Sequence, residues 1–288
     1  MAYIALSVIC SVAVSILLKL APRFEVDVRQ AITGNYLVAA LLALVLFHPD
    51  PYLLLMPMAH PAWRVLLALG LLLPSIFVVL AISVRRVGVV RTDAAQRLSL
   101  LLSLIAAFTL FGEALTWRKG IGMVLGLAAI ACIVARHDAT RSSRSAGGWW
   151  WPLIVFVGFG AIDVLFKRMA QLTGVPFTDV LFATFVVAFV LALLAMVWLY
   201  ATHRARWRWR HLGGALLLGL FNFGDILFYI EAHRHFSHDP SLVFSVMNIG
   251  VIVLATLVGM GWLRERPGRI NQVGLALAIA AVVVIATV

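Results

Sequence analysis

The stretch FGEALTWRKGIGMVLGLAAIACIV, residues 111–134, occurs a second time in altered form as LRERPGRINQVGLALAIAAVVVIA, residues 263–286. The two copies align without gaps and pair Glu113 with Glu265. Each copy ends in an apolar run of the kind that enters a bilayer as a helix. Internal repetition decides an architecture before any single motif does, because both copies are expected to adopt the same fold. The sequence therefore predicts a protein built from two similar halves.

Further correspondences extend the repeat toward the start of each half. SILLK, ending at Lys19, matches DVLFK, ending at Lys167. ALGLLLPSIFVVLAISVRR, residues 68–86, matches LLGLFNFGDILFYIEAHRH, residues 217–235. The predicted organisation is a first five-helix repeat over 1–136, a polar connector over 137–148 and a second five-helix repeat over 149–288.

Composition indicates that the chain lies in lipid. Of its 288 residues, 63% are hydrophobic and 12% are charged, and the mean hydropathy is +1.04. Soluble domains have about 45–50% apolar and about 25% charged residues. Apolar runs recur with a length of about 20 residues, which a helix needs to cross roughly 30 Å of hydrocarbon. Breaks at charged residues, Pro and Gly predict ten spans, near 2–21, 29–47, 62–84, 91–111, 118–135, 149–171, 177–201, 211–232, 240–263 and 268–287.

The number of spans in each half has a geometric consequence. With five spans per half, the second half must start from the opposite side of the membrane, so the repeats are inverted. Inverted repeats are a transporter architecture, with a substrate site near the midplane and alternating access. The sequence therefore predicts an all-α integral membrane protein with ten transmembrane helices as two inverted five-helix repeats. A central polar cavity is expected between spans one, three, four, six, eight and nine.

Both halves carry one loose motif, in which a glycine-bearing helix pair ends in Glu113 or Glu265 and a Gly, Gly122 or Gly274, follows nine residues later. In this motif, its span count and its duplication, the chain resembles the ten-helix EamA-like carriers of the drug/metabolite transporter (DMT) superfamily, over essentially its whole length. Such carriers export amino acids or drugs, or carry nucleotide sugars and other metabolites. The resemblance implies a secondary active or exchange transporter of a small metabolite in the inner (plasma) membrane. The expected metabolite is an amino acid, a nucleoside-like solute or a drug-like solute, and transport is expected to be coupled to protons.

The distribution of basic residues predicts the orientation of the chain. The formal charge is +11, and the basic residues cluster between apolar runs, which argues against nucleic-acid binding. Loops after odd-numbered spans hold most of the arginines, and the cytoplasmic side retains Arg and Lys. This count places both termini outside, whereas members of the family are usually drawn with both termini inside. The RWRWR stretch ending at Arg210 is interpreted as a topological anchor or as a segment that meets anionic lipid.

Ionisable side chains at membrane depth are costly, so those inside spans are candidates for a functional site. Asp163 and Lys167 lie four residues apart in the sixth span, the spacing of an ion pair within a helix. They are either a self-neutralising pair or a proton-coupling carboxylate whose partner the substrate draws away. In the eighth span, Asn222 and Asp225 share a face beside Gly224. This pair is the strongest candidate, and a hydrogen bond in helix packing is its structural alternative.

The fourth and ninth spans supply further polar side chains. Asp93, Gln96 and Arg97 share one face of the fourth span, and Asn248 is the counterpart of Gln96 in the ninth. The spacing of Asp93 and Arg97 also fits a self-neutralising pair. Residues at span ends are attributed to snorkelling or topology: Lys19, Glu113, Glu231 and Glu265. The predicted substrate-binding set is Asn222, Asp225, Asp163, Lys167, Gln96, Arg97, Asn248, Asp93 and Lys19.

Signatures of covalent chemistry are not found in the sequence. It contains no HExxH, GxSxG or GxxxxGK[ST] motif, and its two cysteines fall inside apolar runs. An intramembrane aspartyl protease needs GxGD, and residues 222–225 read NFGD. We therefore expect no enzyme, no metal and no cofactor beyond a coupling proton. The expected partners are a small-molecule substrate and membrane lipids, with a monomer or homodimer as the assembly. The alternative function is a flippase of lipids or lipid headgroups with the same fold.

Overall fold

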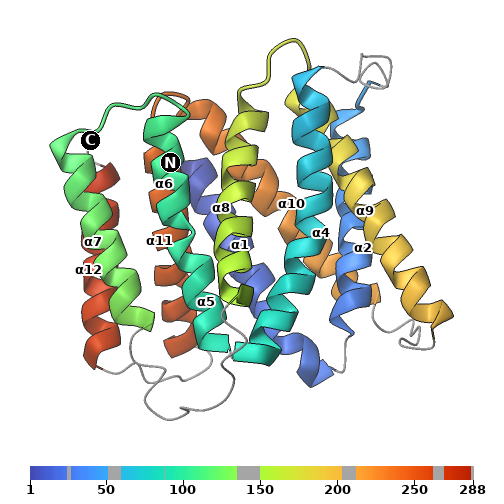
Figure 1. The fold of residues 1–288 in the computed structure, drawn as a ribbon, viewed down its shortest axis with the longest axis horizontal. Helices are drawn as coiled ribbons and strands as arrows, with labels where there is room; N and C mark the ends of the chain where they lie inside the picture. Colours follow the sequence, from blue (N-terminus) through green and yellow to red (C-terminus); the bar gives the residue numbers. More distant parts are fainter. Residues whose placement is uncertain are drawn as a thin grey trace. The chain divides into compact units, whose positions relative to one another are not determined.

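The computed structural model describes residues 1–24, 27–50, 60–87, 89–134, 150–202, 212–261 and 269–286, and these ranges contain helices and turns but no strand. Figure 1 shows the helices. Their bounds are α1 Ala2–Leu20, the 3-10 helix η1 Ala21–Phe24, α2 Val28–Phe47, α4 Pro61–Val87, α5 Val89–Leu98, α6 Leu100–Thr109, α7 Trp117–Val134, α8 Trp150–Ala170, α9 Phe177–Ala201, α10 Leu212–His235, α11 Pro240–Gly261 and α12 Arg269–Ala286.

The predicted spans coincide with these helices to within a few residues. Span seven, predicted over 177–201, agrees with α9 at both ends. Among the described residues, five helices are long and apolar enough to cross a membrane, judged by their length and composition alone: α2, α4, α9, α10 and α11. The all-α membrane fold is therefore confirmed. The inverted relation of the two halves stays a prediction, and the connector 137–148 lies outside the described residues.

The fourth predicted span differs from the prediction because it is broken into α5 and α6 at Ser99. The Ser99 hydroxyl donates to the carbonyl oxygen of Gln96 at 2.6 Å. The backbone N–H of Leu102 also donates to the Ser99 carbonyl at 2.9 Å, which is a tighter turn than an α-helix makes. Serine hydroxyls that bond to the preceding turn bend helices. Hydropathy does not register this bond, so the sequence indicated one continuous span.

The chain packs as two compact units. Unit 1 comprises Met1–Val8, Ile76–Val164 and Ala232–Val288. Unit 2 comprises Ile9–Ser75 and Leu165–Glu231. Each unit therefore takes residues from both predicted halves of the sequence.

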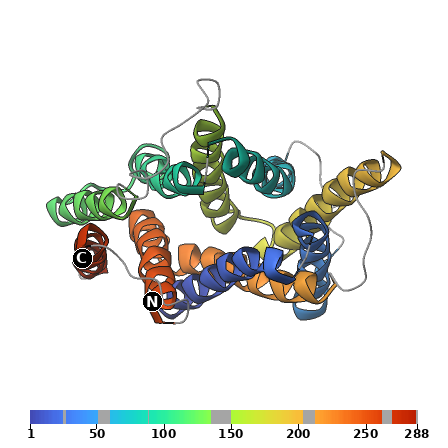
Figure 2. The ribbon, with the colours of Figure 1, turned by 90° about the horizontal axis from the view of Figure 1, so that it is seen from below.

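Within each unit, helices that the sequence repeat equates pack against each other. In unit 1, α7 packs against α12, which correspond to spans five and ten (Figures 1 and 2). There α6, the second part of span four, also packs against α11, which is span nine. In unit 2, α2 packs against α9, spans two and seven. These three pairs of matched helices are therefore direct neighbours in the fold.

Glycines bring α2 and α10 into close contact in unit 2. A Cβ atom added at Gly219 of α10 would lie 2.5 Å from the Cβ of Val38 and 3.0 Å from the carbonyl oxygen of Asn35. A Cβ at Gly34 of α2 would lie 2.6 Å from the Cβ of Ala215. Small residues allow helix backbones in membranes to approach, where packing rather than the hydrophobic effect drives association. The start of α10 is thereby fixed against α2.

We expect Gly219→Val to lower the free energy of unfolding by about 2 kcal/mol, because overpacking a tight contact costs roughly 1–3 kcal/mol. Gly213→Val is the matched control, since a Cβ at Gly213 on the same helix meets nothing within 4 Å. Thermal unfolding of both variants in detergent measures the difference. Equal melting temperatures would contradict the close α2–α10 contact.

Candidate functional site

A buried ionic cluster, here called the Glu113 cluster, joins three segments of unit 1. Its members are Glu113 in the turn between α6 and α7, Lys119 in the first turn of α7, Asp239 directly before α11, and Ser241 in the first turn of α11. The Lys119 Nζ lies 2.7 Å from Glu113 Oε1 and 2.6 Å from Asp239 Oδ1. The Glu113 side chain is only 1% exposed, whereas that of Asp239 is 46% exposed. Lys119 thus bridges a buried and a half-exposed carboxylate.

Glu113 also caps the N-terminus of α11. Its Oε2 accepts the backbone N–H of Ser241 at 2.8 Å, and its Oε1 accepts the Ser241 hydroxyl. The first N–H groups of a helix lack partners within the helix, and its dipole favours negative charge there. This finding corrects the interpretation of Glu113 as a span-end residue that reaches for water, because the carboxylate is buried and bonded. The cluster is a brace whose carboxylates already have partners inside the protein.

Asp163 is held in unit 1 by a serine that the sequence analysis did not select. Its Oδ2 accepts a hydrogen bond from the Ser103 hydroxyl of α6 at 2.7 Å. Ser103 is fully buried and Asp163 is half-buried. One turn earlier on α8, a Cβ at Gly160 would lie 2.7 Å from the Cβ of Leu102, so α8 and α6 are close at this level. Hydrogen bonds to an ionised carboxylate are stronger than those between neutral groups.

The other predicted residues of unit 1 lie on α5 and α11. Gln96 and Arg97 are half-buried on α5. The Asn248 amide donates to the Phe244 carbonyl of its own helix at 3.0 Å. The side chain of Asp93 lies outside the described part of the chain. The roles of these residues in substrate binding stay predictions.

In unit 2, Asn222 and Asp225 lie one turn apart on α10. Asn222 is 8% exposed, and its Nδ2 has no hydrogen-bond partner among the described residues. Asp225 is half-buried. Between them, a Cβ at Gly224 would lie 3.0 Å from the Sγ of Cys10, so α1 packs closely against this part of α10. The region therefore combines a carboxylate with a buried amide donor that the described residues leave unbonded.

Lys167 is placed in the same unit by an aromatic pair. Phe166 of α8 meets Tyr229 of α10 edge-to-face, with ring centroids 6.0 Å apart. Tyr229 lies one turn beyond Asp225 on α10, and Lys167 follows Phe166 directly on α8. The Lys167 side chain is wholly buried, and a buried ammonium is costly unless it is compensated. The ion pair with Asp163 stays a prediction, and the side chain of Lys19 lies outside the described residues.

Two more buried polar groups of unit 2 lack partners within the described ranges. They are both amide atoms of Asn35 and the hydroxyl of Tyr36, adjacent on α2. Asn35 is 1% exposed and Tyr36 is fully buried. Buried polar groups are almost always hydrogen-bonded, so each unpaired one needs an explanation such as an ordered water.

Long apolar helices are typical of a multi-pass membrane protein, and the described residues of this chain also bury polar side chains, among them Lys167 and Asn222. The sequence model of a protein family, described as the EamA-like transporter family, matches residues 1–135. An uncharacterized protein from Haemophilus influenzae is 38% identical over 280 residues, which cover 96% of this chain and 94% of that protein. The chain belongs to the EamA-like transporter family, a part of the DMT superfamily whose members are membrane transporters.

The fold is also found among solved structures. One crystal structure of a protein aligns with this chain at a TM-score of 0.70, and the alignment covers 99% of this chain and 98% of the chain in that structure. The two sequences are 14% identical, so the likeness concerns the fold alone.

Proposed function

We propose that this protein is a secondary carrier of a small polar solute in the inner membrane, and that Asn222 and Asp225 contact the solute. The observation that carries the proposal is the buried Asn222 amide, whose Nδ2 has no partner among the described residues. Leaving a buried donor unpaired costs about 1–3 kcal/mol. A solute with a hydrogen-bond acceptor would remove this cost on binding, which makes the amide a source of affinity and of specificity.

The neighbouring carboxylate suggests the class of solute. Asp225 adds a negative group one turn from the amide, so the pair suits a molecule with both a cationic or donor group and an acceptor. Amino acids, nucleoside-like compounds and cationic drugs meet this description. Asp225 is the proposed proton-handling group, because a carboxylate at membrane depth changes the net charge of its surroundings when it binds a proton or releases one. Asp163, bonded to Ser103, is the second proposed group of this kind.

Asn222→Leu tests the proposal, because an unpaired amide and a packing amide respond in opposite ways. We expect the variant to melt at a temperature equal to or above that of the wild type, since an apolar group no longer leaves a donor unpaired. A panel of amino acids, nucleosides, sugars, cationic drugs and lipid headgroups should first be screened for thermal stabilisation of the wild type in detergent. The variant should then bind the active compound about tenfold more weakly than the wild type, which is the effect of one lost hydrogen bond.

Tyr36→Phe is the matched control, because it removes another unpartnered buried polar group of unit 2 on a different helix. It should keep both the melting temperature and the response to the compound. A lower melting temperature of Asn222→Leu would show that the amide is structural. A wild-type response to lipid headgroups alone would favour the flippase.

A further inference from the structure

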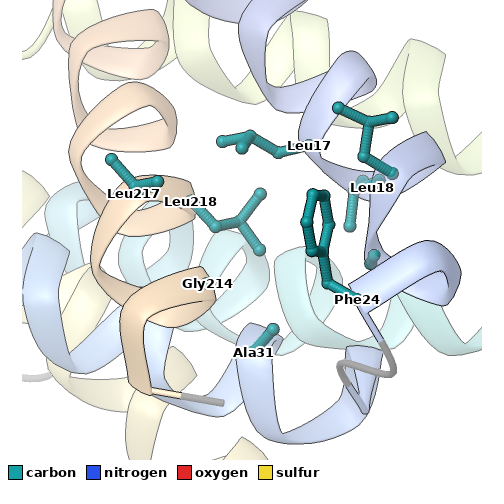
Figure 3. Close-up of a pocket in the computed structure, with 9 residues that line it drawn as sticks. Leu17, Leu18, Phe24, Ala31, Gly214, Leu217 and Leu218 are labelled. Carbon is teal, nitrogen blue, oxygen red and sulfur yellow. The ribbon is translucent and has the colours of Figure 1, made fainter. Parts of the chain in front are cut away.

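An apolar cavity of unit 2 differs in chemistry from the region around Asn222 and Asp225. It has a volume of about 430 Å³ and lies where α1 ends and where α2 and α10 begin. Figure 3 shows leucines of α1 and α10 facing each other across it, with the Phe24 ring alongside. Its lining is Leu17, Leu18, Leu20, Ala21, Phe24, Ala31, Gly214, Leu217 and Leu218.

The lining excludes most small polar ligands. Among the described residues, no lining side chain carries a charge or a hydrogen-bonding group. A cavity walled mainly by Leu, Ala and Phe favours apolar molecules, because it offers water few polar partners. A hydrocarbon chain fits such a lining, whereas the solute proposed for Asn222 does not.

The cavity is continuous with the surface that faces lipid. Leu217 lines it and is itself 47% exposed. Its neighbours Leu216 and Leu220 on α10 are 58% and 49% exposed, and α10 is long and apolar enough to cross a membrane. Exposed leucines of a spanning helix contact acyl chains. The medium next to this cavity is therefore hydrocarbon, and a lipid chain reaches it without crossing water.

The charge of the adjoining sequence indicates which lipid is favoured. Along the chain, α10 begins at Leu212, directly after the densest basic stretch of the sequence, which contains Arg204, Arg206, Arg208 and Arg210. Juxtamembrane arginines attract anionic headgroups of the cytoplasmic leaflet. We propose that this cavity binds an acyl chain of an anionic phospholipid, as a lipid site separate from the solute-binding residues.

Gly214 and Gly213 allow a matched test. Gly214 lines the cavity, whereas its neighbour Gly213 does not, and a Cβ at Gly213 meets nothing within 4 Å. Gly214→Leu should place a side chain in the space of the lipid chain. Native mass spectrometry of the detergent-purified protein, titrated with dioleoyl phosphatidylglycerol, measures the bound lipid. We expect at least about tenfold weaker binding by Gly214→Leu, because each buried methylene contributes roughly fourfold.

Gly213→Leu should bind phosphatidylglycerol like the wild type. Dioleoyl phosphatidylcholine should bind more weakly than phosphatidylglycerol to the wild type and to Gly213→Leu. Circular dichroism and melting temperature show that each variant is folded before the titration. Equal binding by Gly214→Leu and the wild type would overturn the proposal. Equal losses in the two variants, or equal affinity for the neutral lipid, would overturn it as well.

Discussion

Glu113→Ala is expected to lower the free energy of unfolding by about 3 kcal/mol, the lower end of what breaking a buried ion pair costs. Three contacts disappear together in this variant, and one of them is the hydrogen bond from the Ser241 hydroxyl. Lys119 loses its contact of 2.7 Å with the buried carboxylate, and the first turn of α11 loses the acceptor for the Ser241 N–H. The effect is not larger because Asp239 still pairs with Lys119 at 2.6 Å. Thermal and urea unfolding in a mild detergent measure the loss.

Two comparisons separate the cluster from a general effect of altered charge. Arg118→Ala removes an exposed cation next to Lys119 and should change stability by less than about 0.5 kcal/mol, as surface substitutions do. The double variant Glu113→Ala with Lys119→Ala should lose less than the sum of the single losses, because residues of one network are not additive. Additive losses would show that Glu113 and Lys119 act independently and would contradict the bridge.

Hydropathy predicted the helices well because the bilayer sets their length. Pro176 and the charged stretch after Tyr200 bound span seven on both sides, and α9 runs from Phe177 to Ala201 as expected. The break at Ser99 was not predicted, because LSLLLS reads as uninterrupted apolar sequence. The helix bends there because the Ser99 hydroxyl donates a hydrogen bond to the Gln96 carbonyl. No Pro or Gly in this stretch indicates the bend in the sequence.

The candidate site was partly predictable, because a polar residue in an apolar span is visible in the sequence. Asn222 and Asp225 were selected in this way, but the burial of the amide and its missing partner required the structure. The Glu113 cluster could not be assembled from sequence, because Glu113 and Ser241 are 128 residues apart. The Asp-Pro-Ser sequence at 239–241 does mark a helix start, with Pro at the first helical position. It does not reveal which distant carboxylate caps that helix.

The state of hydrogen bonding is one criterion that favours a solute-binding role for Asn222 over the Glu113 cluster. In unit 1, the carboxylates of Glu113 and Asp163 have donors within the fold, which favours a bracing role for the first and a restrained one for the second. In unit 2, the Asn222 amide has no such partner among the described residues. A carrier must release its solute, so its contacts cannot be satisfied permanently from within. This reasoning favours α10 over the Glu113 cluster for the proposed solute contact.

Asp225→Asn is expected to abolish solute transport while the protein stays folded. The change keeps the size of the side chain and removes its charge, so packing of α10 against α1 near Gly224 and Cys10 should persist. We expect uptake into proteoliposomes, measured with the compound found by the stabilisation screen, to fall about a hundredfold. That fall corresponds to about 2.7 kcal/mol, which lies within the range of a hydrogen bond to a charged group. Uptake driven by a pH gradient should disappear with it, because the amide cannot bind and release a proton.

Asp27→Asn and Asp225→Glu complete this experiment. Asp27 accepts the N–H of Arg29 at 2.9 Å at the start of α2, and Asn is an equally good capping residue, so both stability and uptake should be retained. Asp225→Glu restores the charge and should recover part of the uptake, since the longer side chain misplaces the carboxylate without removing it. Wild-type uptake by a folded Asp225→Asn variant would exclude the carboxylate from transport. A different outcome is that Asp225→Asn fails to fold and Asp225→Glu restores both stability and uptake. This outcome would show that the Asp225 charge stabilises unit 2, because a carboxylate needed only for transport would not affect folding in the absence of solute.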